Sequence, residues 1–438
     1  MAGKKRVLAK LEVVENKALA VVLLTVFLDI LGFGILLPVM PELIFTIFEP
    51  AGYSFDQSLV ALGWLTAVYP LAQFVATPVL GQLSDRHGRK PVLAISLAGT
   101  ALGYVLFALG ILLHNIPLLF VGRILDGITG GNISVARAVV ADVSPRRHRA
   151  RNFGLIGACF GVGFIMGPVI GARMAEANAV IFGFLRTPGW FDTATPFWFA
   201  AILSLLNMVL VVALLPETNR HIDAALKVAW SKSLRNIRTA ATHPALRVIF
   251  TTEFLFWGGF TFFTTFFQVL LIQKLGFTTS NVGDMFAYIG ICIALSQALL
   301  VPFVAKYIKG HDVLRFSLLG TGLALFLQLL PNTTWQLLLT APVIAVFNGL
   351  TVANATALVS LSADRKIQGE VLGIEASVQA LAQAVPAIIA GYVATFGVST
   401  PVIVGGCIVV VAGIVYLALY RVPKKVEASE AETMPSAP

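Results

Sequence analysis

The feature that most constrains this chain is a series of long apolar runs that recurs along its whole length. A bilayer core about 30 Å thick is crossed by about 20 apolar residues in helical form. Hydrocarbon offers no partners to backbone N–H and C=O groups, so such runs must cross it as helices. Only 12% of the residues are charged, against about a quarter in soluble domains. We therefore expect an all-α membrane protein with twelve spans, at residues 18–46, 57–84, 91–113, 116–143, 152–176, 196–215, 246–273, 281–304, 313–331, 336–361, 369–396 and 399–420.

Basic residues alternate with these spans. The segment before the first span and every connection after an even-numbered span are basic, whereas the other connections carry only Arg186 and Lys274. The positive-inside rule then predicts that the basic connections and both termini are cytoplasmic. The net charge of +9 is thus expected to face the inner leaflet of a cytoplasmic or plasma membrane, and nucleic acid is not expected as a partner. The first apolar run is too long for a cleavable signal peptide and lacks a small-residue cleavage site.

The longest basic connection separates six spans from six. Within it, the stretch LKVAWSKSLRNIRTA (226–240) is apolar on one face and basic on the other. This pattern favours an interfacial helix on the anionic inner leaflet over a helix that binds a protein partner. The expected organisation is a cytoplasmic segment (1–17), an N-terminal six-helix bundle (18–215), a cytoplasmic linker with the basic helix (216–245), a C-terminal six-helix bundle (246–420) and a disordered cytoplasmic tail (421–438).

The second half weakly repeats the first. An offset of 224 residues places Asp29 on Glu253, and an offset of 218 places Pro168 on Pro386. Together with the six-plus-six count, these matches indicate two parallel repeats related by a pseudo-two-fold axis along the membrane normal.

The most specific motif is GQLSDRHGRKPVL (81–93), between spans 2 and 3. Gly81 and Gly88 would permit close helix approach and a tight turn. Asp85 can accept hydrogen bonds from a helix N-terminus or pair with an arginine, while Arg86 and Arg89 add charge to the cytoplasmic side. The stretch resembles the G-x-L-x-D-R-x-G-R-K loop of the major facilitator superfamily.

Three further stretches resemble twelve-span drug:proton antiporters of that superfamily. They are LDILGFGILLPVMPEL (28–43), GRILDGITGG (122–131) and GFIMGPVIG (163–171). In addition, VADVSPRRHRARNFG (140–154) is similar to tetracycline exporters and related organic-anion carriers. The resemblance implies the major facilitator fold. The sequence departs from the pattern at Asp126, where a glutamine is frequent, and at Lys309, where the repeat would place a counterpart of Asp85.

Four charged residues inside spans are candidates for proton coupling: Asp29, Glu253, Arg123 and Asp126. A carboxylate inside an apolar helix costs roughly 2.5–3.5 kcal/mol on insertion scales, and burial lets an acid take up a proton near neutral pH. The resemblance implies that the first and seventh helices line a central cavity and that Arg123 takes part in proton transfer. Alternatively, Asp29 and Glu253 are structural hydrogen-bonded acids, and Arg123 and Asp126, three apart on one helix face, form a buried pair.

The motif residues also suggest conformational roles. By resemblance, the 81–93 loop latches the two halves on the cytoplasmic side, with Asp85 facing the start of span 11; the alternative is that its charges only set topology. The small residues of span 5 should let helices pack closely, and its proline should bend the helix. The expected gate residues are Gly81, Asp85, Arg86, Gly88, Arg89, Asp142, Arg151 and Glu370, and the packing residues are Gly163, Gly167, Pro168 and Gly171.

Aromatic and polar side chains at membrane depth are candidates for the substrate cavity. Aromatic rings could form a lipophilic wall with cation–π contacts, although such a run is also typical of a lipid-facing surface. The candidates are Gln73, Asn132, Phe256, Trp257, Gln268, Gln297, Asn348, Glu375 and Gln379.

These features favour a secondary active transporter that works by alternating access. A proton-coupled antiporter exporting small amphipathic or aromatic compounds is the leading hypothesis, with the proton gradient as driving force, no cofactor or metal, and a monomer in contact with lipid. The alternatives are a symporter or facilitator for organic anions or metabolites, in which Arg123 or Arg173 meets a carboxylate, and a non-transporting membrane sensor. An enzyme is not expected, since no nucleophile–base set, phosphate loop or metal cluster is recognisable.

Overall fold

The chain folds into two compact helical units. The first comprises Met1–Glu42 with Ala72–Lys232, and the second comprises Leu43–Leu71 with Ser233–Pro438. The helix α2 (Phe55–His87) therefore gives its first half to the second unit and its second half to the first. The structure, a computed structural model, describes residues 2–144, 149–181, 185–219, 222–223, 228–242, 246–362 and 368–422.

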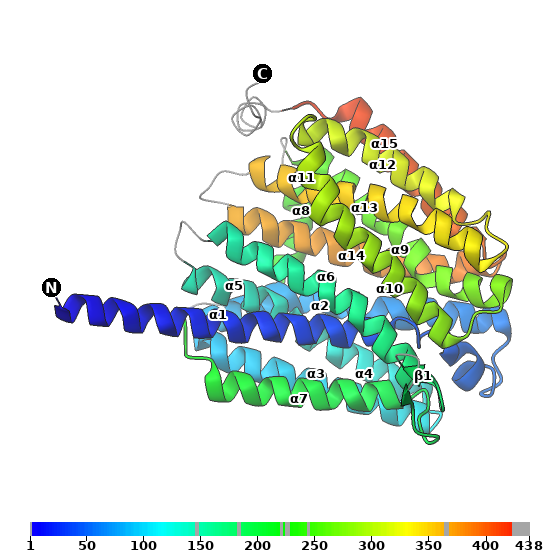
Figure 1. Cartoon of the computed structure of the whole chain (residues 1–438), viewed down its shortest axis with the longest axis horizontal. Helices are drawn as coiled ribbons and strands as arrows, with labels where there is room; N and C mark the ends of the chain where they lie inside the picture. Colours follow the sequence, from blue (N-terminus) through cyan, green and yellow to red (C-terminus); the bar gives the residue numbers. More distant parts are fainter. Residues whose placement is uncertain are drawn as a thin grey trace. The chain divides into compact units, whose positions relative to one another are not determined.

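The first unit consists of long helices and one short hairpin (Figure 1). The helix α1 (Ala2–Leu36) begins well before the expected span, and turns replace it at residues 37–41, which include Pro38 and Pro41. The remaining elements are the second half of α2, α3 (Arg89–Leu112), α4 (Ile116–Thr129), the 3₁₀ turn η2 (Gly130–Asn132), α5 (Ile133–Val143), α6 (Arg149–Met174), the antiparallel strands β1 (Val180–Ile181) and β2 (Leu185–Arg186), and α7 (Thr195–Leu214).

The second unit is also helical. Its described residues include two short π-helical turns. The π-helix is rare and is found mostly as a local bulge inside α-helices. Its elements are η1 (Ile44–Phe48), the first half of α2, α8 (Lys232–Thr242), α9 (Arg247–Leu275), α10 (Thr279–Leu295), η3 (Ser296–Leu300), α11 (Val301–Val304), α12 (Gly310–Leu327), α13 (Thr334–Ser362), α14 (Gln368–Ala394) and α15 (Thr400–Leu419).

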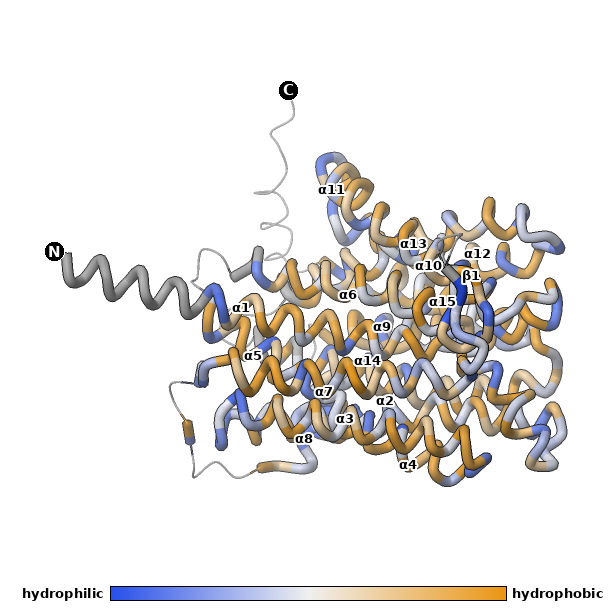
Figure 2. The backbone as a smooth tube through the Cα atoms, turned by 60° about the horizontal axis from the view of Figure 1, so that its bottom comes forward, coloured by the Kyte–Doolittle hydropathy of each residue, from blue (hydrophilic) through white to orange (hydrophobic). Residues whose placement is uncertain are grey.

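Every expected span coincides with helix, which confirms the predicted fold class. Among the described residues, ten helical segments are long and apolar enough to cross a bilayer. The expected fourth span is not among them because η2 interrupts it and leaves α4 with 14 residues. The ninth, α12, has 18 residues and begins with polar side chains, including Asp312 and Arg315. Figure 2 shows hydrophobic residues along the middles of the long helices and hydrophilic residues gathered towards their ends.

The two units repeat the same internal packing. In the first, α1 packs against α6 and α7, and α3 packs against α4 and α7; in the second, α9 packs against α14 and α15, and α12 packs against α13 and α15. A buried hydroxyl pair recurs as well. Thr100 and Thr129 join α3 to α4 with their Oγ1 atoms 2.8 Å apart, and Thr321 and Thr351 join α12 to α13 at 3.3 Å. The repeat suggested by the sequence is therefore a repeat of structure.

The residues related by the two sequence offsets make the same glycine–proline contact in each unit. In the first unit, a Cβ placed on Gly34 of α1 would lie 3.1 Å from Cδ of Pro168 on α6. In the second, a Cβ on Gly258 of α9 would lie 3.2 Å from Cγ of Pro386 on α14. Gly258 lies 224 residues after Gly34, and each glycine follows its candidate acid, Asp29 or Glu253, by five residues. The two acids thus occupy equivalent positions in their own units.

Candidate functional site

Asp29 lies on α1 beside the break in the fourth span. The amide Nδ2 of Asn132 in η2 donates a 2.8 Å hydrogen bond to Oδ2 of Asp29. The break is anchored on α2, because Nε2 of Gln73 donates to the carbonyl oxygen of Gly130 at 3.0 Å and Oγ of Ser134 donates to that of Thr77 at 3.1 Å. Two residues expected at the substrate cavity, Gln73 and Asn132, therefore position the candidate proton acceptor.

Arg123 and Asp126 form a buried pair on α4. The guanidinium Nη1 of Arg123 donates to Oδ2 of Asp126 at 3.1 Å, and both side chains are nearly inaccessible. This is the paired arrangement expected from their spacing. A charge on either residue alone would be costly to bury, whereas the pair compensates both. Asp126 also interacts electrostatically with Asp29, so three of the four proton-coupling candidates belong to one cluster in the first unit.

The glycines of α6 lie close to α1. A Cβ on Gly163 would lie 3.0 Å from Cγ2 of Ile30, and one on Gly167 would lie 2.7 Å from Cα of Gly34. At Gly171 it would collide with the carbonyl oxygen of Ile35. The α1 segment that follows Asp29 is therefore fixed against α6 by direct backbone contact.

The 81–93 motif is mostly helical. The sequence predicted a turn between spans that end at residue 84 and begin at residue 91, but α2 continues through His87, and Gly88 leaves the helical region, with φ of 98°. The close approach expected at Gly81 is wrong, because a Cβ there would meet only Oγ of Ser134, at 3.8 Å. Gly88 does require glycine, because of its φ and because a Cβ would lie 2.5 Å from Oε2 of Glu217.

Arg89 is the centre of a polar network in the first unit. Its Nη1 donates to Oδ1 of Asp85 and to Oγ of Ser84, both at 2.6 Å, and its Nε donates to Oδ2 of Asp142 at 3.1 Å. Asp142 thus joins the gate residues through Arg89. Arg86 is only partly buried. Arg151 and Glu370 lie in α6 and α14, but their side chains are outside the described set, and the predicted latch between the halves stays a prediction.

Glu217, which the sequence reasoning missed, caps α3. Its Oε1 accepts the backbone N–H of Arg89 at 2.9 Å, and its Oε2 accepts that of Lys90 at 3.1 Å. The same Oε1 accepts the N–H groups of Thr218 and Asn219. A carboxylate at a helix N-terminus is stabilised by the macrodipole and satisfies otherwise unpaired donors. The available signal was an acidic residue at the start of an otherwise basic connection.

Glu253 lies on α9 in the second unit, where it is paired with a second acid. Its side chain is buried, and its carboxyl group lies next to that of Glu375 on α14, where the two acids interact electrostatically. Glu375 is half-buried, and its Oε1 accepts a 3.2 Å hydrogen bond from Oγ1 of Thr356 on α13. Thr356 lies 224 residues after Asn132, so the two units place a polar donor at the same point of the repeat. Thr356 is a further residue that sequence reasoning missed.

Aromatic rings of α9 lie next to this acid pair. Phe256 is buried and, with Glu253, lines a small pocket that also includes Thr351 and Tyr416. Its ring is 5.5 Å from that of half-buried Trp257 and 6.1 Å from that of Phe260, measured between centroids. The alternative of a mainly lipid-facing run is not favoured, because most of these side chains are buried.

The remaining cavity candidates are not gathered into one place. Gln268 and Asn348 are buried on α9 and α13, whereas Gln297 in η3 is exposed and Gln379 on α14 is half-buried. Nε2 of Gln268 donates to the carbonyl oxygen of Thr264 at 3.2 Å, within its own helix. No described contact joins these four side chains to the acid pair.

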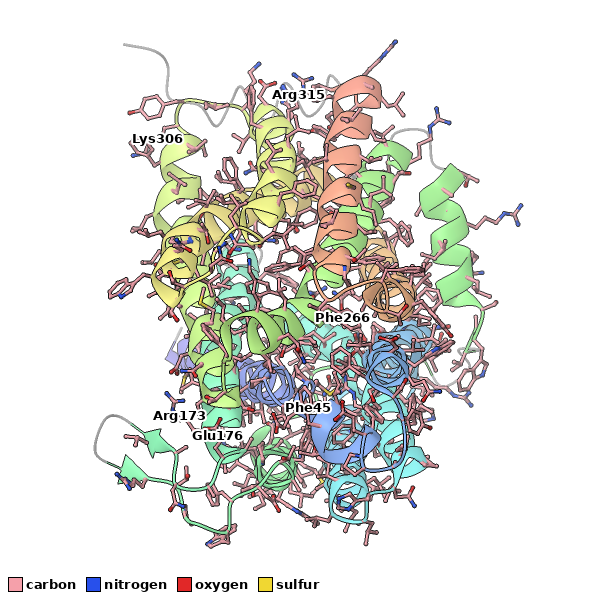
Figure 3. The ribbon with its side chains drawn as sticks, turned by 90° about the vertical axis from the view of Figure 1, so that its right-hand side faces the viewer. Phe45, Arg173, Glu176, Phe266, Lys306 and Arg315 are labelled. Atoms are coloured by element: carbon pink, nitrogen blue, oxygen red, sulfur yellow. The ribbon has the colours of Figure 1, made fainter. Side chains whose placement is uncertain are left out.

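Arg173, the second arginine considered for an anionic substrate, lies at the end of α6. It is half-buried, and Figure 3 shows it with Glu176 beside the β1–β2 hairpin. In the second unit, the start of α12 carries an arginine–acid pair, with Nη1 of Arg315 2.6 Å from Oδ1 of Asp312. Figure 3 shows Arg315 and Lys306 at one end of that unit.

Sequence comparison supports the resemblance noted from the motifs. The sequence profile of the Major Facilitator Superfamily matches residues 22–311 and 249–436. The chain is 30% identical over 366 residues to the tetracycline resistance protein, class E, of Escherichia coli, covering 82% of this chain and 83% of that protein. It is 25% identical over 391 residues to the quinolone resistance protein NorA of Staphylococcus aureus, covering 88% and 92%.

Solved structures share the fold. The human organic anion transporter MFSD10 superposes with a TM-score of 0.69 at 22% identity, covering 92% of this chain and 99% of that one. A D-xylose–proton symporter superposes with a TM-score of 0.72 at 16% identity, covering 93% and 98%. At these identities the similarity concerns the fold alone.

Proposed function

Since the chain belongs to the major facilitator superfamily and is a multi-pass membrane transporter of a small-molecule substrate rather than an enzyme, we propose that it is a proton-coupled antiporter that exports small amphipathic or aromatic compounds by alternating access. The proton gradient is the proposed driving force, and we expect a monomer with both termini in the cytoplasm.

The observation that carries this proposal is the acid pair of Glu253 and Glu375. Two ionised carboxylates this close to each other in a poorly solvated place repel, so a state in which the pair holds one proton is favoured over the fully ionised state. Glu253 is buried and Glu375 is half-buried, so the proton is held inside the unit while one partner stays accessible. The pair therefore has the properties of a proton-binding position within the membrane.

The location of the pair suggests how proton binding could drive movement. Glu253 and Glu375 lie on α9 and α14, which pack directly against each other. If the shared proton leaves, two like charges remain at close range in a poorly solvated place, and their repulsion opposes that packing. Substrate binding that favours the separated arrangement would then favour proton release. In the first unit, Asp29 is the equivalent acid, held by Asn132.

Two observations favour aromatic or amphipathic compounds over organic anions. The relatives that align over most of the chain are named for resistance to tetracycline and to quinolone, both of which contain fused ring systems. In addition, the charge of Arg123 is already compensated by Asp126, which leaves it poorly suited to bind a carboxylate. The ring cluster around Phe256 supplies an apolar surface beside the acid pair.

The test is substrate flux in proteoliposomes under an imposed pH gradient. The panel should contain a lipophilic cation, a tetracycline-like zwitterion and an aromatic carboxylate. We expect uphill movement of the first or second compound opposite to the protons. Movement in the same direction as protons would replace antiport by symport, and selective movement of the carboxylate would favour the organic-anion carrier.

Variants separate coupling from folding. Asp29→Asn and Glu253→Gln together should leave membrane insertion intact but uncouple flux from the pH gradient, because neither side chain can then exchange a proton. Asp56→Asn, at the exposed start of α2, is a control that removes a carboxylate outside the expected spans. Wild-type proton-driven flux in the double variant would refute the assignment.

A further inference from the structure

The helix α8 is fixed to the second unit by one side. Ser233, Asn236 and Ala240 face the unit and are buried. The amide Nδ2 of Asn236 donates to Oγ of Ser377 at 3.1 Å and reaches the carbonyl oxygen of Gly373 at 3.5 Å, both on α14. The helix is therefore a docked element rather than a loose part of a linker.

The docking contact places α8 beside the N-terminal turns of α14. The helix α14 begins at Gln368, and Asn236 contacts it at Gly373 and Ser377. Because the connection before α14 is basic, the positive-inside rule predicts that this end of α14 faces the cytoplasm.

The other side of α8 has the chemistry expected at the boundary between the bilayer and the cytoplasm. Leu234 exposes 68% of its surface although it is apolar, and its neighbours Arg235 and Arg238 are exposed as well. Residues 228–242 include no aspartate or glutamate. A helix face that exposes a leucine beside two arginines, and that has no acid of its own, suits the surface of an anionic bilayer, where an apolar layer lies beneath charged headgroups.

We propose that the outer side of α8 binds the headgroups of anionic phospholipids in the inner leaflet. Arg235 and Arg238 bind the phosphate groups and Leu234 enters the acyl region. Asn236 joins α8 to Ser377 on α14, two residues after Glu375. The bound lipid therefore also stabilises the position of α14, which carries Glu375 of the acid pair. Anionic lipid is then expected to alter transport. The expected effect of anionic lipid on transport rests on the proposed function, whereas the binding of lipid to α8 does not.

Lipid binding is tested first, without transport. Purified protein in neutral detergent is titrated with a fluorescent phosphatidylglycerol, and with the matching phosphatidylcholine as reference. Each basic residue near an anionic surface contributes about 1 kcal/mol, so Arg235→Gln with Arg238→Gln should weaken phosphatidylglycerol binding about thirty-fold at low salt. Arg186→Gln with Lys274→Gln removes the same charge from the non-basic connections and should have little effect. Equal binding by both double variants would overturn the proposal.

The coupling to α14 is tested next, by flux in vesicles. Flux is compared between phosphatidylcholine vesicles and vesicles with about 30 mol% phosphatidylglycerol. Asn236→Ala should keep lipid binding but lose the response of flux to phosphatidylglycerol, and Asn236→Gln should partly restore it. An unchanged response in Asn236→Ala would refute the coupling. Absence of proton-driven flux in both vesicles for the wild type would instead contradict the proposed function, while the binding result would stand.

Discussion

The contact between α1 and α6 can be tested by one substitution made at two positions of the same helix. In Gly167→Ala, the added Cβ would lie 2.7 Å from Cα of Gly34 and 2.7 Å from the carbonyl oxygen of Leu31. Both are backbone atoms of α1, so no side chain can rotate away. In Gly161→Ala, the added Cβ meets nothing within 4 Å.

The magnitudes follow from these two environments. Alanine is favoured over glycine inside a helix by about 0.5–1 kcal/mol, and this gain is common to both variants. Overpacking a close contact costs about 1–3 kcal/mol, and only Gly167→Ala incurs it. The difference between the variants therefore isolates the overpacking term. We expect Gly161→Ala to be slightly more stable than the wild type and Gly167→Ala to be less stable than Gly161→Ala by about 1–3 kcal/mol.

The assay is unfolding of the purified protein in mixed micelles by increasing denaturing detergent, followed by circular dichroism. Gly157→Ala, which also has open space at the added Cβ, serves as a second control and should behave like Gly161→Ala. If Gly167→Ala is as stable as the two controls, then α1 and α6 do not touch in the way described, and the packing role assigned to the motif is wrong.

Three further predictions concern the cap of α3 and the acid pair. Gly88→Ala should destabilise the first unit by about 1–3 kcal/mol because few other residues adopt this φ, whereas Gly154→Ala should not; equal thermal stability of the two would contradict the backbone argument. Glu217→Ala should cost about 1–3 kcal/mol because the N–H groups of Arg89 and Lys90 lose their acceptor, and Glu217→Gln should cost less; the same loss in both would show that shape, not hydrogen bonding, matters. Glu375→Gln should flatten the pH profile of flux, since the amide cannot share a proton with its partner, and an unaltered profile would exclude the pair from coupling.

Much of the fold could be predicted from local sequence patterns. Apolar runs, basic connections and the glycine spacing of α6 each depend on residues that are close in sequence. They predicted the helical segments and the presence of close packing at the small residues of α6, but not that α1 would be the helix packed there. The comparison of offsets also placed Asp29 and Glu253 correctly in equivalent positions, because both lie at the same point of a repeated contact.

The partners of the site residues could not be predicted in the same way. Glu375 lies 122 residues after Glu253, and Glu217 lies 128 residues after Arg89, whose backbone N–H it accepts. Such pairs are made by the packing of whole helices. The 81–93 motif was misjudged for a different reason. Two glycines suggested a turn over several residues, but a single unusual φ at Gly88 is enough to reverse the chain.

The repeated threonine pairs have a consequence for how the protein is made. Thr100–Thr129 and Thr321–Thr351 each join helices that follow one another in the chain. A polar group that enters hydrocarbon needs a partner. Thr129, Thr321 and Thr351 each donate to a carbonyl oxygen of their own helix, and Thr100 meets Thr129 as soon as the next span is made. Each of these helix pairs can therefore enter the bilayer as a hairpin whose hydroxyl groups are already bonded. During biogenesis, the two hairpins are expected to be the earliest stable intermediates, one for each half of the protein.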